Sequence, residues 1–235
     1  MTEINRYEIE AGLKTPLRIA VVSDLHSSPY AGLMYKLAEL APDLILCPGD
    51  ILHTASPDER GLEFLAEAAK RFPTFCSVGN HEVKHGDARD LISATGATLL
   101  DDRWVSFGGI TVGGLSSGYV GCDRQGRMKR TPPPNLGVLD GFFAEKGFKL
   151  LLSHHPEYYS RYLKDKDVDL VISGHAHGGQ WRVFGRGVFA PGQGLFPKYT
   201  SGFYDGKLLV SRGLSNHAFV PRIFNKPELI IIDLK

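Results

Sequence analysis

The chain has 235 residues, of which 43% are hydrophobic and 23% charged, a composition that is typical of a globular protein and excludes a disordered or collagen-like polymer. Its 27 Lys and Arg residues balance 26 Asp and Glu residues, so the net charge of +1 indicates no nucleic-acid or anionic-membrane partner, although local patches stay open. A chain of this length buries a large core without disulfides or a structural metal, and we expect a single domain over residues 1–235.

The cysteines and the apolar runs indicate the compartment. Cys47, Cys76 and Cys122 are an odd number, and two of them lie in apolar runs, which is typical of a reducing compartment. The first eight residues lack the basic head and apolar stretch of a signal peptide. No run reaches the ~18 apolar residues of a membrane span. We therefore expect a cytoplasmic protein without a membrane span.

Short aliphatic runs alternate with stretches of helical periodicity, an order typical of an α/β fold with buried strands. The predicted strands are 17–23, 43–47, 74–78, 149–153, 169–173 and 229–234. The predicted helices are 32–40, 56–71, 87–95 and 156–163. Ser56, Pro57 and Glu59 form a capping pattern for the second helix, which Pro73 ends. Residues 104–115 predict a hairpin that turns at Gly108 and Gly109, and residues 116–137 predict a loop.

Five of the predicted strands are followed by side chains that can bind metals. These side chains are Asp24 and His26, Asp50, Asn80 and His81, His154 and His155, and His175 and His177. Groups at the carboxyl ends of parallel strands converge even when they are distant in sequence. Gly49, Gly79 and Gly174 precede the candidate ligands, where a residue without a Cβ lets the backbone approach the metals. The sequence therefore predicts a metal site at the strand ends.

These motifs resemble the signature blocks of the calcineurin-like metallophosphoesterases. The blocks are Asp24-Leu25-His26, Gly49-Asp50, Gly79-Asn80-His81-Glu82, His154 and Gly174-His175-Ala176-His177. The resemblance implies a four-layer α/β/β/α sandwich, in which helices flank two mixed β-sheets and a dinuclear metal site lies at the carboxyl ends of the strands. The tail, with Gly178-Gly179-Gln180, Arg212-Gly213-Leu214 and Pro221-Arg222, resembles a bacterial branch of cell-envelope phosphodiesterases and UDP-diacylglucosamine hydrolases.

The resemblance also implies the ligand sets and the reaction. One metal would be held by Asp24, His26, Asp50 and His177, and the other by Asp50, Asn80, His154 and His175, so that Asp50 bridges them. Imidazole and oxygen ligands without thiolate suit Mn, Fe or Zn, and we expect two such divalent or trivalent ions. The implied reaction is hydrolysis of phosphate esters, preferably diesters, by a hydroxide that bridges the two metals.

Several side chains beside the predicted ligands are candidates for substrate chemistry. His81 is the predicted proton donor to the leaving group, with orientation of a ligand as the alternative. Asn80, His155 and Arg212 are predicted to contact substrate, Arg212 as a bidentate phosphate clamp, and ordinary structural roles stay open for them. Glu82 is expected either to orient His81 or to be a solvated surface carboxylate.

The remaining polar and aromatic features carry less specific expectations. His53 and His85 are expected on the surface. The basic residues between 124 and 130, together with His217, are candidates for contacting a phosphorylated substrate, with solvation as the alternative. Glycines and a proline interrupt the aromatic segment 192–204, which is expected to form part of the core or a rim that binds an apolar or nucleotide group.

Three functional hypotheses follow. The first is a metal-dependent phosphoesterase that acts on a small phosphorylated substrate. The second is a nuclease, against which the near-zero net charge and the lack of a long basic stripe count. The third is a non-catalytic scaffold, although such a protein would be expected to lose ligands and all the predicted positions are filled here.

Overall fold

The computed structural model describes residues 2–53, 59–118, 131–190, 193–215 and 221–235, and two six-stranded sheets dominate this part of the chain. The first sheet has the order β1 (Glu3–Ile9), β16 (Glu228–Leu234), β2 (Leu17–Val21), β3 (Leu44–Cys47), β4 (Thr74–Cys76) and β5 (Thr98–Leu99). Strands β2 to β5 are parallel, and β16 is antiparallel to β2. The carboxyl ends of β2, β3 and β4 therefore lie along one edge.

The second sheet is also mixed. Its order is β14 (Gly202–Tyr204), β15 (Leu208–Val210), β9 (Leu170–Ser173), β8 (Phe148–Ser153), β7 (Ile110–Leu115) and β6 (Arg103–Phe107). Strands β15, β9, β8 and β7 are parallel, and β14 and β6 are antiparallel edge strands. The predicted hairpin at Gly108 and Gly109 is confirmed as the β6–β7 turn, where both glycines have positive φ values.

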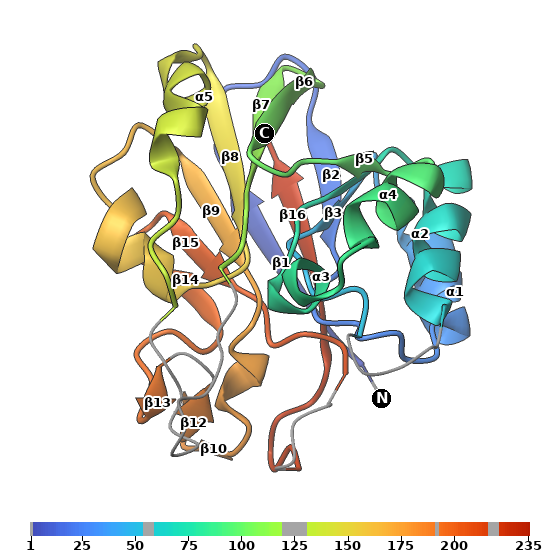
Figure 1. Cartoon of the computed structure of the whole chain (residues 1–235), viewed down its shortest axis with the longest axis vertical. Coiled ribbons are helices and arrows are strands. Elements are labelled where there is room, and N and C mark those ends of the chain that lie inside the picture. The colour runs from blue at the N-terminus through green and yellow to red at the C-terminus, as the bar shows by residue number, and fades with distance from the viewer. Residues whose placement is uncertain (1, 54–58, 119–130, 191–192, 216–220) are drawn as a thin grey trace.

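Alternating side chains along each central strand separate the core into layers. In β2, Ile19 faces the second sheet and Ala20 faces the helices, and in β9, Ile172 and Val171 divide in the same way. Both faces of these strands are covered, which explains their unbroken apolar sequence. Helices α1 (Ala31–Leu40), α2 (Arg60–Arg71) and α4 (Ala88–Ala94) cover the first sheet, and α5 (Asp140–Ala144) lies beside the second sheet (Figure 1). The predicted four-layer α/β/β/α sandwich is confirmed.

Helix bounds agree with most of the sequence expectations. The helices are α1 (Ala31–Leu40), α2 (Arg60–Arg71), α3 (Asn80–Lys84), α4 (Ala88–Ala94) and α5 (Asp140–Ala144). The described residues also form two 3-10 turns, Leu136–Leu139 and His177–Gly179, and a π-helical turn, Tyr159–Leu163. Helix α2 ends before Pro73 as predicted, whereas the capping residues Ser56 and Pro57 lie outside the described residues. The helix predicted over 156–163 has a π-helical second half.

Strand β1 is an element that the sequence patterns did not predict. Its residues Glu3–Ile9 alternate between exposed and half-buried positions, and the strand occupies the edge of the first sheet. It is held by parallel pairing with β16, the last strand of the chain. Local sequence is a weak signal for such a strand because its stability comes from a partner more than 200 residues away.

Two short hairpins extend from the end of the sandwich that carries the carboxyl ends of the central strands. They are β10 (Arg182–Val183) with β11 (Arg186–Gly187) and β12 (Phe189–Ala190) with β13 (Gly194–Leu195). Figure 1 shows β10, β12 and β13 together at the lower end of the molecule. None of the helices in the described ranges is long and apolar enough to cross a membrane.

We expect Ile172→Ala to lower the free energy of unfolding by about 2–5 kcal/mol, because Ile172 is fully buried between the two sheets and the truncation leaves a cavity there. Urea denaturation followed by circular dichroism measures the effect. Val138→Ala, at a 40% exposed position, is the control and should change stability by no more than about 0.5 kcal/mol. Equal effects of the two substitutions would contradict the inter-sheet core.

Candidate metal centre

The predicted metal ligands lie together where the central strands of both sheets end. Asp24 and His26 follow β2, Asp50 follows β3, Asn80 follows β4 and begins α3, His154 follows β8, and His175 and His177 follow β9. The backbone N–H of His26 donates to the carbonyl of Asp50 at 3.0 Å, and that of His175 donates to Asp24 Oδ1 at 3.0 Å. Because β2 and β9 belong to different sheets, the second bond joins the two sheets at the centre.

One group of candidate ligands consists of Asp24, His26 and His177, all of them buried. His26 Nε2 lies 3.3 Å from His177 Nε2, and His177 Nε2 lies 3.7 Å from Asp24 Oδ1. The two imidazole rings stack with an interplanar angle of 18°. One donor atom from each residue therefore faces a common point, which is the arrangement that a single cation needs.

The second group consists of Asp50, His154 and His175, and these are also buried. His154 Nε2 lies 3.1 Å from Asp50 Oδ2 and 3.2 Å from Asn80 Oδ1. Asp50 Oδ2 also lies 3.8 Å from His26 Nε2 of the first group. The Asp50 carboxylate thus lies close to a nitrogen of each group, and its role as a bridging ligand, which the resemblance implies, stays a prediction.

Both groups have the donor chemistry of a transition-metal site. The donors are imidazole nitrogens and carboxylate or amide oxygens, which suit Mn, Fe and Zn. His175 Nε2 is buried and has no hydrogen-bond partner in the part of the chain that the structure describes. An unsatisfied buried nitrogen is costly unless another atom satisfies it. The residues present therefore fit a pair of metal ions.

The charges of these groups depend on burial and on their neighbours. Burial opposes ionisation of Asp50, but His154 outweighs it and holds the pKa of the Asp50 carboxyl well below its usual range. Burial also lowers the pKa of His154, yet the Asp50 carboxylate reverses this effect and raises that pKa to about 10. Burial is the main cause of the lowered pKa of His175 and of His177. Neutral imidazoles present the lone pair that a metal ion needs.

The backbone at the metal centre adopts conformations that residues other than glycine rarely adopt. The candidate ligands with positive φ values are Asp24 (52°), His26 (47°), Asp50 (54°), His175 (65°) and His177 (45°). Each left-handed residue costs roughly 1–2 kcal/mol relative to the right-handed conformation. Such strain persists only where the surrounding structure holds it, and it gathers at functional sites.

Glu82 holds three of the neighbouring backbone groups. Its carboxylate accepts hydrogen bonds from the N–H groups of Asp50 at 2.8 Å, Leu52 at 2.8 Å and Gly79 at 2.7 Å. The side chain is fully buried, which corrects the alternative of a solvated surface carboxylate. Burial and the nearby Asp50 charge raise the pKa of Glu82 to about 7. Glu82 therefore joins the loops after β3 and β4 to each other.

The glycines before the candidate ligands leave room for carboxylates. A Cβ on Gly79 would lie 2.1 Å from Asp50 Oδ1, and one on Gly174 would lie 2.4 Å from Asp24 Oδ2 and 2.0 Å from Ser23 Oγ. The backbone at Gly79 and Gly174 therefore approaches the carboxylates of the candidate ligands Asp50 and Asp24 closely. No substitution at either position fits without moving Asp24 or Asp50.

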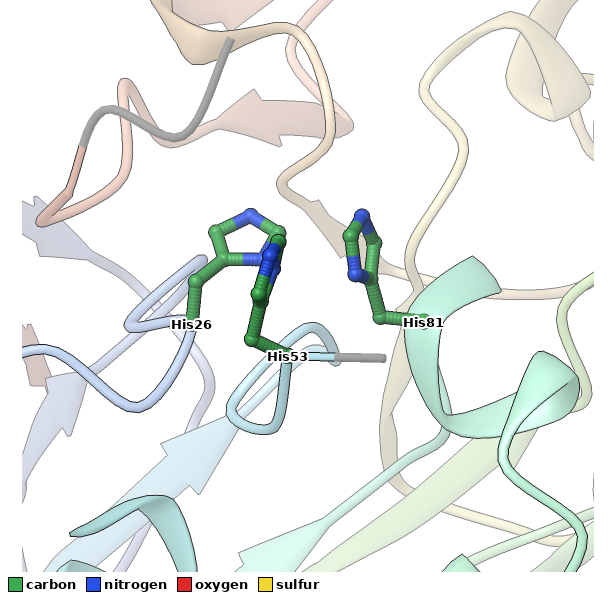
Figure 2. A group of neighbouring side chains, drawn as sticks. All are labelled: His26, His53 and His81. Atoms are coloured by element: carbon green, nitrogen blue, oxygen red, sulfur yellow. The ribbon is translucent and has the colours of Figure 1, made fainter. Parts of the chain in front are cut away.

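His53 is a member of the site that the sequence patterns missed. Figure 2 shows His26, His53 and His81 gathered from the loops after β2 and β3 and from α3. The rings of His53 and His81 stack with centroids 4.9 Å apart, and those of His26 and His81 meet edge to face at 4.5 Å. His53 is half-buried and was expected on the surface. The sequence could have indicated this role, because His53 follows the candidate ligand Asp50 by three residues in the same loop.

His155 lies behind the candidate ligands. Its ring is fully buried, and Nε2 lies 2.7 Å from Ser117 Oγ and 3.0 Å from the carbonyl of Gly118. Burial lowers the pKa of His155 to about 3 and keeps the ring neutral. Its ring centroid is 4.3 Å from that of His175. These contacts favour a structural role for His155, which the sequence left open as the alternative to substrate binding. Contact between His155 and the substrate stays a prediction.

Two arginines lie near the end of the chain beside the first group. Arg212 Nη2 donates to Glu3 Oε2 at 2.7 Å and to Glu228 Oε1 at 3.2 Å. Its guanidinium thus has carboxylate partners within the chain, and binding of a phosphate by Arg212 stays a prediction. Arg222 Nη2 lies 3.2 Å from His177 Nδ1 and donates to the carbonyl of Arg212 at 2.6 Å. Arg222 therefore contacts a candidate ligand, a role that its sequence context did not indicate.

Some sequence expectations concern residues that the structure leaves undescribed. The basic residues between 124 and 130, Cys122 and His217 lie outside the described residues. The aromatic segment 192–204 is described from residue 193 onward, where Tyr199 is buried and Phe196 is 82% exposed. Part of this segment belongs to the core and part lies on the surface.

Comparison with known proteins identifies the family of this chain. Residues 17–179, more than half of the chain, match the model of the calcineurin-like phosphoesterases, and the chain belongs to this family. The family binds a dinuclear metal site, and the model match covers every candidate ligand from Asp24 to His177.

The relatives are distant. An uncharacterized metallophosphoesterase of Campylobacter jejuni is 29% identical over 99% of this chain, which spans 63% of that relative's length. The phosphodiesterase YaeI of Escherichia coli is 27% identical over 93% of this chain and 82% of its own length. A crystal structure of the calcineurin-like phosphoesterase YfkN from Bacillus subtilis is 14% identical, covers 84% of this chain and 81% of its own, and has a TM-score of 0.46.

We expect Gly174→Ala to lower the metal content of the purified protein and its thermal stability, because the new Cβ would displace the Asp24 carboxylate. Metal analysis by mass spectrometry and a thermal melt measure the two effects. Gly32→Ala is the matched control, since a Cβ at Gly32 in α1 meets no heavy atom within 4 Å. A Gly174→Ala protein with the parent's metal content would argue against Asp24 as a ligand.

Proposed function

We propose that this protein is a metal-dependent phosphoesterase that hydrolyses small phosphate esters and prefers diesters. The observation that carries the proposal is the position of Asp50 Oδ2 between two groups of candidate ligands, 3.1 Å from His154 Nε2 and 3.8 Å from His26 Nε2. The preference for diesters is supported by the name of one relative, the phosphodiesterase YaeI. The resemblance to UDP-diacylglucosamine hydrolases stays a prediction.

The chain offers two ligand sets that share one carboxylate. Asp24, His26, Asp50 and His177 would hold one ion, and Asp50, Asn80, His154 and His175 the other. Bound cations would neutralise phosphate charge and make water more acidic. Manganese, iron and zinc are the ions that we propose, because the ligands combine imidazole with oxygen.

His81 is the residue that we propose as the proton donor to the leaving group. Its backbone N–H donates to Asp50 Oδ1 at 2.9 Å, which ties α3 to the candidate bridging ligand. Its half-buried imidazole lies beside His26 and His53, at the outer side of the buried ligands. The stacked ring of His53 restricts the orientation of His81. Asn80, the preceding residue, would contact the substrate as well as a metal.

We expect the parent protein supplied with Mn²⁺ to hydrolyse bis(para-nitrophenyl) phosphate. Asp50→Asn should lower the rate at least about a hundredfold, because loss of the shared carboxylate removes several kcal/mol of electrostatic stabilisation. Release of para-nitrophenolate measures the rate, and metal analysis accompanies it. Asp165→Asn, a change of the same kind at an exposed position, is the control.

The same assay separates the three hypotheses. A parent protein that binds two metal ions and hydrolyses neither the diester nor the monoester would support the scaffold. Salt-dependent binding and cleavage of single-stranded DNA would support the nuclease. The first result would contradict the proposed hydrolysis of phosphate esters, and DNA cleavage that is faster than hydrolysis of the small esters would contradict the proposed preference for small substrates.

We expect His81→Ala to slow the hydrolysis of an alkyl phosphodiester by about 10²–10⁴-fold and that of a para-nitrophenyl ester much less, because para-nitrophenolate leaves without a proton donor. Steady-state rates with both esters measure this difference, and the metal content should stay at the parent's level. His85→Ala, at the end of α3, is the control. Equal losses with both esters would indicate that His81 acts by orienting a ligand.

A further inference from the structure

Three phenylalanines project from the end of the molecule that carries the candidate metal centre. Phe184, Phe196 and Phe224 are 101%, 82% and 88% exposed. Each also has a positive φ value, 50°, 52° and 53° respectively. A bulky residue rarely adopts this conformation, and the exposure of an apolar phenylalanine ring to water is unfavourable in free energy. Strained backbone therefore holds three apolar side chains outward, which indicates a function at this surface.

These phenylalanines belong to a larger apolar surface. Its other members are Trp181, Val183, Leu195 and Ile223, which are 43%, 53%, 70% and 42% exposed. The backbone of Arg182 donates to the carbonyl of Ile223 at 3.0 Å, so that the β10–β11 hairpin and the segment 222–224 lie side by side. We call these seven residues the apolar rim.

Two hollows connect the three phenylalanines of the apolar rim. A hollow of about 360 Å³ is lined by Val183, Phe184 and Phe224, together with Gly185. A second hollow of about 380 Å³ is lined by Gly185, Phe196 and neighbouring residues. Since Gly185 lines both, the exposed phenylalanines belong to one continuous surface. A monomeric soluble protein exposes a patch of this kind mainly where it binds a partner or a membrane.

The apolar rim carries positive charge at its edges. Between residues 181 and 204 the sequence contains Arg182, Arg186 and Lys198 and no Asp or Glu. Arg186 and Lys198 are exposed, and so is Lys226, two residues after Phe224. Two acidic residues lie near these cations, Glu3 near Arg182 and Lys226, and Asp205 near Lys198, and they offset part of this charge. Phenylalanine tips flanked by cations match the acyl chains and phosphate headgroups of an anionic bilayer.

The apolar rim is joined directly to the candidate metal centre. Asn225 Nδ2 donates to the carbonyl of His177 at 2.7 Å, and Arg222 Nη2 lies 3.2 Å from His177 Nδ1. Arg182 Nη1 donates to the carbonyl of Gly178, the residue after His177, at 3.0 Å. A surface that docks through the rim would therefore lie next to the loop that carries His177.

We propose that the apolar rim inserts into the surface of an anionic lipid bilayer and places the candidate metal centre beside the lipid headgroups. The three phenylalanine side chains are almost fully exposed and flanked by exposed cations, which is the combination that a fluid anionic interface accommodates. Arg186, Lys198 and Lys226 are exposed, and each follows one of the three phenylalanines by two residues, so they would meet the phosphate groups. This docking does not depend on the proposed hydrolysis, because it needs neither a metal ion nor a phosphate ester as substrate.

Sedimentation with vesicles tests the proposal. We expect the full chain to sediment with vesicles that contain phosphatidylcholine and phosphatidylglycerol, and to bind phosphatidylcholine alone more weakly. The double variant Phe184→Ser/Phe224→Ser should bind the anionic vesicles at least about tenfold more weakly, because two highly exposed rings no longer insert. Tyr35→Ser is the matched control, since Tyr35 is a 69% exposed aromatic residue on α1, away from the rim. Circular dichroism checks that each variant is folded.

The fluorescence of Trp181 gives a second, independent measurement. The chain has two tryptophans, and Trp104→Phe leaves Trp181 in the rim as the only one. We expect its emission to shift to shorter wavelength on vesicles and to be quenched by lipids with brominated acyl chains. Arg186→Glu/Lys198→Glu should remove the preference for anionic vesicles.

Three results would overturn the proposal. The first is the absence of vesicle binding by the parent at low salt. The second is an equal loss of binding by Phe184→Ser/Phe224→Ser and by Tyr35→Ser. The third is a parent oligomer in gel filtration that the Phe184→Ser/Phe224→Ser variant dissociates, because the rim would then be an interface between copies of this chain.

Discussion

The buried carboxylate of Asp50 is the constraint on which the rest of this structure depends. It lies between His154, which follows a strand of the second sheet, and His26, which follows a strand of the first. An ionised carboxylate is stable away from water only where cations or hydrogen-bond donors surround it. The two sheets must therefore pack with their strand ends aligned, and the inter-sheet core of aliphatic side chains sets that alignment.

The loops around Asp50 combine strain with restraint. Five candidate ligands have left-handed backbone conformations, which the chain would not adopt by itself. Three features hold them in place: the Glu82 carboxylate on three backbone N–H groups, the absence of a Cβ at Gly79 and Gly174, and the hydrogen bond from His175 to Asp24. The site is thus preorganised by buried polar contacts, and the layered core beneath it gives those contacts a rigid base.

The same end of the molecule combines two unlike surfaces. The candidate ligands are buried and polar, whereas the apolar rim is exposed and flanked by basic side chains. His177 connects them, because its carbonyl and its ring contact Asn225 and Arg222 of the segment that also carries Phe224. The overall charge of +1 conceals this asymmetry, since acidic residues of the chain balance the basic residues that flank the rim. A binding event at the rim and chemistry at the centre would therefore share one structural element.

The sequence by itself determined the α/β class, the central strands, the β6–β7 hairpin and the set of donor residues at the strand ends. These features depend on local apolar runs, on glycine pairs and on the residue types that can bind metals, all of which can be read along the chain. Only the tertiary structure decided the pairing of β1 with β16, the burial of Glu82 and His155, the place of His53 beside His81 and the exposure of Phe184 and Phe224. Each of these depends on which distant segments come to lie next to one another, and a local pattern holds no information about a neighbour that arrives from the other sheet.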